Sequence, residues 1–130
     1  MGTHCHIGIM NPEDKTIIGA YVHYDGNPDN MVPSLVEYVR EKTLTGLHVL
    51  IAEAQAHAGL RGLYCSTEGG IEFLEHGELE IVDQHNFLDS AVDYAYLIQT
   101  DTGLLEAFTR TFEDGRPWEK MKDYETYVPV

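Results

Sequence analysis

Positive charge is scarce in this sequence, whereas acidic residues are abundant. Eight Lys and Arg residues stand against 22 Asp and Glu residues, so the 130-residue chain has a formal net charge of −14. No Lys or Arg occurs between Arg61 and Arg110, and ten acidic residues fall in that interval. A surface of this sign repels nucleic-acid backbones and anionic membranes, and it attracts basic protein surfaces. We therefore expect no direct binding to DNA or RNA, although an acidic composition also serves solubility.

Cysteine and long apolar runs are equally scarce. Cys5 and Cys65 are the two cysteines, which is too few for a disulfide scaffold, and cytosolic thiols are usually reduced. No apolar run approaches the roughly 20 residues that a membrane helix needs. The first ten residues also lack the basic start and apolar stretch of a secretory signal peptide. We therefore expect a cytoplasmic protein that does not engage a membrane.

The length predicts a single domain over residues 1–130, because a chain of this size can bury one core but not two. Turn residues at 11–15 separate two alternating stretches, 3–10 and 16–25, and predict a β-hairpin. Apolar residues at helical spacing then predict two helices with a pause at 43–46 between them. Further strands are predicted at 60–66, 71–75, 78–82, 92–99 and 104–109, and a short helix at 118–122.

This order of elements predicts the fold class. The 71–75 and 78–82 strands are expected to form a hairpin, and 104–109 is expected to pair with 92–99 in antiparallel fashion. The 16–25 strand is apolar on both faces, which is typical of a strand in the middle of its sheet. We therefore predict an α+β fold, with a mainly antiparallel sheet and one or two helices packed on one face.

The best-placed polar cluster follows the 16–25 strand. Tyr21, His23 and Asp25 alternate along one face of it, just before a turn and a predicted helix start. Many small-ligand and protein-contact sites combine aromatic and polar side chains beside a helix N-terminus. In the alternative interpretation, His23 and Asp25 only fix the turn. The candidate ligand- or partner-binding residues are Tyr21, His23, Tyr24, Asp25, Asn27, His4, His6 and Arg61.

A metal site is disfavoured by the strand pattern. Alternation places His4 and His6 on the face opposite Cys5, so this triplet cannot direct three side chains at one ion. The expected hairpin register places His4 near Val22, with His23 on the other side of the sheet. We therefore predict no metal and no cofactor.

A nucleophilic cysteine is the second chemical possibility. Cys5 lies among core-facing positions, where a thiol is usually inert packing. Cys65 precedes a Gly-Gly turn and is expected to be more exposed, but a reactive thiol also needs a partner base. The sequence does not place such a base.

The first 40 residues and a short later stretch carry recognisable motifs. They are Met1-Gly2-Thr3, Ile7-Gly8-Ile9, Tyr21-x-His23-x-Asp25-Gly26-x-Pro28, and more loosely Asp93-Tyr94-Ala95-Tyr96. The pattern resembles a group of small bacteriophage accessory proteins with a GT-R-S-x-I start and a Y-C-H-W-D-G-Y-P signature before a helix. The chain departs from that group at His4-Cys5-His6 and at Tyr24, where the group has Trp. The resemblance implies a phage origin and a role in the host cytoplasm, where the protein would block or divert a host system.

Together these observations predict a non-enzymatic phage protein that counteracts a host system, such as a defence system, by binding. An acidic surface could bind a host protein, or the strand-end cluster could sequester a small nucleotide signal as a sponge, with Arg61 or Arg40 balancing phosphate charge. The alternative is a small hydrolase or metal-dependent enzyme that uses His23 and Asp25, or Cys65.

Aromatic residues also predict self-association. Tyr21 and Tyr24 are expected on opposite faces of the sheet, with Tyr94 and Tyr96 together on one face. Two short helices cannot cover that much aromatic surface, and exposed aromatic patches often mark contacts between copies of a chain. We therefore expect a homo-oligomer.

Overall fold

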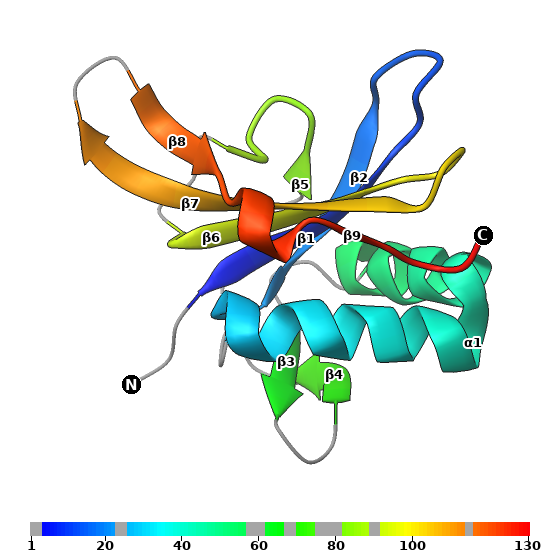
Figure 1. The fold of residues 1–130 in the computed structure, drawn as a ribbon. Coiled ribbons are helices and arrows are strands. Elements are labelled where there is room, and N and C mark those ends of the chain that lie inside the picture. Colours follow the sequence, from blue (N-terminus) through cyan, green and yellow to red (C-terminus); the bar gives the residue numbers. More distant parts are fainter. Residues whose placement is uncertain are drawn as a thin grey trace.

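The computed structural model describes residues 4–22, 26–56, 62–66, 70–74, 82–88, 92–113 and 116–130. Within these residues the chain forms two layers, a helical layer and a nine-stranded mixed sheet (Figure 1). The predicted α+β fold, with helices on one face of the sheet, is confirmed. None of the described helices is long and apolar enough to span a membrane.

The sheet has the strand order β4-β3-β2-β1-β6-β7-β8, with β5 beside β2 and β9 beside β7. The described strands are β1 (Cys5–Met10), β2 (Ile17–Val22), β3 (Gly62–Ser66), β4 (Gly70–Leu74), β5 (Val82–Asp83), β6 (Tyr94–Gln99), β7 (Leu104–Glu113), β8 (Arg116–Lys120) and β9 (Thr126–Tyr127). The β1–β6 and β2–β3 pairs are parallel, and the other described pairs are antiparallel. The sheet is therefore mainly antiparallel, as predicted.

The predicted hairpin of β1 and β2 is confirmed, but its expected register is wrong by one residue. Val22 pairs with Cys5 rather than with His4. The turn closes where the Asn11 N–H donates to the Thr16 carbonyl at 3.0 Å. Lys15 adopts a left-handed conformation (φ 61°) inside this turn, so the turn takes one residue more than expected.

The helical layer is formed by α1 (Pro28–Ala56), which contains a sharp break. Thr43 is non-helical, with φ 67° and ψ 166°, and its Oγ1 accepts a hydrogen bond from the Gly46 N–H at 3.2 Å. Thr43 therefore caps a second helical segment. Figure 1 shows the chain reversing there, so that the two halves of α1 lie beside each other under the sheet. The predicted pause between two helices is confirmed.

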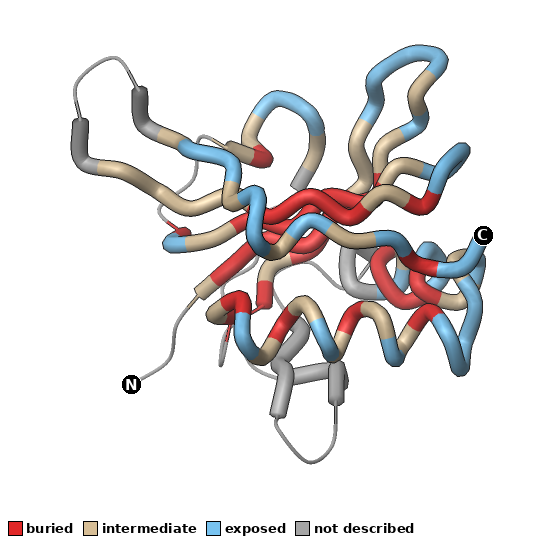
Figure 2. The backbone as a smooth tube through the Cα atoms, in the orientation of Figure 1, coloured by how far each residue is buried: buried red, intermediate tan, exposed pale blue. Residues whose placement is uncertain are grey.

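The main core lies between the helices and the sheet, where buried residues follow the central strands and the inner sides of the helices (Figure 2). Its largest fully buried side chain is Tyr96, whose hydroxyl donates to the Gly26 carbonyl at 2.6 Å. The expected surplus of aromatic surface is therefore wrong for Tyr96, because one chain buries it completely.

A smaller cluster covers part of the opposite face. Residues 82–88, which contain β5 and the turn after it, lie between the raised hairpins β1–β2 and β7–β8 (Figure 1). Phe87 is buried there against Ala95 and Leu97. A Cβ at Gly8 would lie 2.7 Å from the Phe87 ring, so the glycine allows this segment to approach the sheet closely.

The predicted hairpin of 71–75 with 78–82 falls mostly on residues outside the described part of the chain. In the described part, β4 pairs with β3, and β5 pairs with β2. One predicted element is wrong. The expected helix at 118–122 is instead β8, followed by a 3-10 helix, η1 (Lys122–Tyr124). Pairing with the long strand β7 decides the conformation of β8, which local helical spacing could not indicate.

Candidate ligand-binding surface

Three of the predicted site residues meet on the face of the sheet that points away from the helices. The rings of His4 and Tyr21 are stacked, with their centroids 5.6 Å apart, and His6 meets Tyr21 edge-on at 6.3 Å. The buried His6 Nδ1 lies 3.1 Å from the Phe87 carbonyl oxygen. His6 therefore anchors residues 82–88, whereas the half-buried His4 and Tyr21 border the solvent.

The other predicted site residues are not brought into this cluster. His23, Tyr24, Asp25 and Arg61 lie outside the described residues. Asn27 precedes the helix, and its carbonyl accepts the N–H groups of two residues in the first turn, Asn30 at 3.1 Å and Met31 at 2.9 Å. These contacts give Asn27 a structural role in starting α1.

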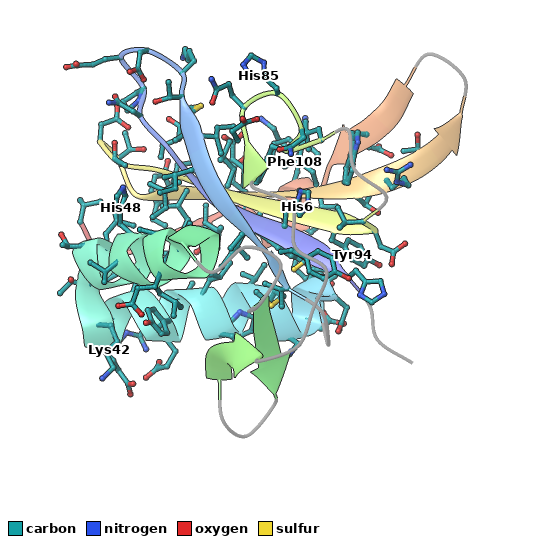
Figure 3. All side chains as sticks on the ribbon, turned by 180° about the vertical axis from the view of Figure 1, so that it is seen from behind. His6, Lys42, His48, His85, Tyr94 and Phe108 are labelled. Carbon is teal, nitrogen blue, oxygen red and sulfur yellow. The ribbon has the colours of Figure 1, made fainter. Side chains whose placement is uncertain are left out.

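Strand register extends the histidine cluster from β2 to β8. One row of directly paired positions runs over β2, β1, β6, β7 and β8, through Tyr21, His6, Ala95, Phe108 and Lys120. Directly paired residues share a face of a sheet. Figure 3 shows His6 and Phe108 on the side of the sheet that carries His85, while Lys42 and His48 lie on the helices.

A neighbouring row adds an arginine and a tryptophan. The Asp93 N–H donates to the His4 carbonyl, and the Arg110 N–H donates to the Asp93 carbonyl, both at 3.0 Å. Arg110 in turn pairs with Trp118 on β8. The Arg110 guanidinium lies 5.3 Å from the Trp118 ring centroid, and its Nε donates to the Val92 carbonyl at 3.0 Å. The stacked cation is thus held by both a ring and a backbone group.

We call this set of side chains the open-face surface. It consists of His4, Tyr21, Phe108, Arg110, Trp118 and Lys120, none of which is classed as buried. The Lys120 ammonium lies 6.0 Å from the Phe108 ring and forms an ion pair with Glu106, which raises the pKa of Lys120. Glu106 therefore opposes the charge of Lys120, and Arg110 is the second cation of this surface.

Four of these residues, Phe108, Arg110, Trp118 and Lys120, were not predicted from the sequence. The prediction of a helix over 118–122 separated Trp118 from Arg110. The signal that could have found them is Asp114-Gly115, a pair typical of two-residue hairpin turns, which would have predicted a strand on either side. Alternation along those strands then places aromatic and basic side chains on one face.

The enzymatic alternative gains no support from the described residues. Cys5 is fully buried on the helix side of the sheet, opposite His4 and His6, so neither histidine can act as its base. The side chain of Cys65 and the residues His23 and Asp25 are outside the part of the chain that the structure describes. In the parts of the chain that are described, no three His, Cys, Asp or Glu side chains are grouped closely enough to hold a metal ion.

Comparisons of the chain with protein-family models, with curated proteins and with solved structures find no match.

Proposed function

We propose that this chain is a non-enzymatic phage protein that sequesters a small nucleotide-type ligand of the host on the open-face surface. The observation that carries the proposal is the pair of half-exposed ring stacks, His4 on Tyr21 and Arg110 on Trp118, on one face of the sheet. The flat faces of such side chains are surfaces on which a nucleobase stacks, whichever base it is.

Charge supports the same ligand class. A guanidinium recognises phosphate through paired hydrogen bonds, and Arg110 lies beside the ring of Trp118 that would hold a base. The net charge of −14 disfavours a long polyanion such as DNA or RNA. A ligand with one or a few phosphates contacts only a small part of the sheet. Attraction to the nearest positive group therefore outweighs repulsion by the more distant acidic side chains.

Retention of an unaltered ligand tests the proposal. The purified protein is incubated with a nucleotide extract and washed by ultrafiltration. It is then denatured by heat, and the released fraction is analysed by mass spectrometry. We expect a nucleotide to be retained and released with its mass unchanged. A chemically altered ligand would indicate an enzyme, and absence of any retained nucleotide would contradict the proposal.

Two substitutions locate the binding surface. Trp118→Leu and Arg110→Gln are each expected to weaken binding by about tenfold or more. The first variant loses base stacking, which contributes about 1–3 kcal/mol, and the second loses the paired hydrogen bonds to phosphate. Lys42→Gln is the control, since Lys42 is an exposed cation on α1, on the helix side of the molecule (Figure 3). Thermal melts of all three variants verify that the fold is intact. Equal binding by Arg110→Gln and Lys42→Gln would exclude the open-face surface as the site.

A further inference from the structure

A second surface feature lies on the helix side of the molecule. A groove of about 480 Å³ runs between the first half of α1 and the segment that follows β8. Val32 and Val36, one helical turn apart, and Tyr124 of η1 give it apolar lining. All three are half-buried and pack against the main core, so the lining is held in place. The Tyr124 hydroxyl donates to Asp29 Oδ1 at 2.7 Å and ties the two walls together.

The rim of this groove is acidic. Glu37 lines the helix wall, and Asp123 and Glu125 line the opposite wall, all three exposed. Arg40 also lines the groove, but it forms an ion pair with Glu37 at 2.8 Å. The hydrogen bond to Asp29, burial and the negative charges of Asp29 and Asp123 raise the pKa of Tyr124, in keeping with a negative potential inside the groove.

We propose that this groove binds a short basic peptide segment of a partner protein. An apolar side chain of the peptide would lie against Val32 and Val36, and flanking Lys or Arg side chains would lie beside Asp123 and Glu125. Charge complementarity argues for this occupant, because the chain's net charge of −14 attracts basic segments and the acidic rim orients them. The proposal does not depend on a ligand at the open-face surface, which lies on the other side of the sheet.

Fluorescence anisotropy tests the proposal with a defined probe. The probe is a short labelled peptide with one central Leu flanked by Lys and Arg, and its control has Glu in place of every basic residue. We expect the basic peptide to bind the wild-type protein and to bind more weakly as salt is added. Absence of binding by the basic peptide, or equal binding by the acidic one, would overturn the proposal.

A double variant, Asp123→Asn with Glu125→Gln, tests the position. We expect it to weaken binding of the basic peptide by about tenfold. The matched control is Glu13→Gln with Glu53→Gln, which removes the same charge at exposed sites outside the groove and should leave binding unchanged. An equal loss of affinity in both double variants would mean that general charge attraction alone holds the peptide. It would refute the groove as the binding site.

Amide chemical shifts of the wild-type protein give a readout that needs no variant. Titration with the basic peptide should shift the amides around Val36 and Glu125. Shifts confined to other parts of the chain would equally refute the groove as the binding site.

Discussion

Tyr96 connects the sheet to the turn that precedes the helical layer. Its side chain is fully buried, and its hydroxyl donates to the buried carbonyl of Gly26. The residues just before Gly26 are His23, Tyr24 and Asp25, which form the centre of the predicted site. Tyr96 therefore fixes Gly26, the described residue that directly follows these three.

Replacing Tyr96 by Phe should destabilise the protein by about 1–3 kcal/mol, because the Gly26 carbonyl loses its partner while it stays buried. Burial also raises the pKa of Tyr96 above the ordinary tyrosine value of about 10. The folded state therefore favours the protonated phenol, and this stabilisation is complete below about pH 10 and is lost as the pH rises further.

Urea denaturation across this pH range measures both effects. The wild-type protein should lose stability above about pH 10, and Tyr96→Phe should start lower and fall less steeply. Tyr127→Phe serves as the control, because Tyr127 is 64% exposed. Parallel curves for the wild type and Tyr96→Phe would contradict the assignment.

At the scale of single elements, the break in α1 carries a local strain. Thr43 has φ 67° and ψ 166°, a region that is almost restricted to glycine and costs other residues about 1–3 kcal/mol. Its Oγ1 accepts the Gly46 N–H, but replacing a capping residue by Gly costs only a few tenths of a kcal/mol. The strain therefore outweighs the cap.

Thr43→Gly is thus expected to stabilise the protein by about 1 kcal/mol. The neighbouring exposed Thr45 lies in regular helix, where a change to Gly should destabilise by about 0.3 kcal/mol. Chemical denaturation of both variants tests the difference in sign. A loss of stability in both would show that Thr43 is not strained.

Local patterns predicted those elements whose partners are close in sequence. The β1–β2 hairpin, the β6–β7 pair and the two halves of α1 follow from alternation, turn residues and helical spacing. The register of β1 and β2 could not be predicted, because it depends on the left-handed Lys15 in the turn. The pairing of β5 with β2 links Asp83 to Ile18, and no local pattern encodes a contact over that distance.

The candidate site was predicted in part for the same reason. Alternation placed His4 and His6 on one face, and His23 and Asp25 stay predictions because they lie outside the described residues. The arginine and tryptophan stack was missed because Arg110 and Trp118 meet only when β7 and β8 pair. Site residues from two strands are visible in a sequence only if both strands are predicted.

At the scale of the whole molecule, the structure gives fewer reasons to expect a homo-oligomer than the sequence did. Tyr96 is covered within one chain, and three exposed large hydrophobic side chains remain in the described parts: Val49, Tyr127 and Val130. The half-exposed Tyr21 remains as an aromatic residue that a second copy could cover. If it does, light scattering should give a multiple of 14.6 kDa at micromolar concentration, and a ligand on the open-face surface should lower that mass. A monomeric mass without ligand would contradict self-association.

The position of β1 has a consequence for how the chain reaches its fold. β1 lies between β2, its neighbour in sequence, and β6, which it meets in a parallel pair that joins Cys5 to Tyr94. Closing so long an intervening loop costs conformational entropy before the pair contributes any stability. Chains dominated by such distant contacts fold in milliseconds to seconds rather than in microseconds. Until β6 arrives, the edge of the β1–β2 hairpin is open to pairing with other chains, so a cell that makes this protein rapidly also holds a transient pool of chains prone to aggregate.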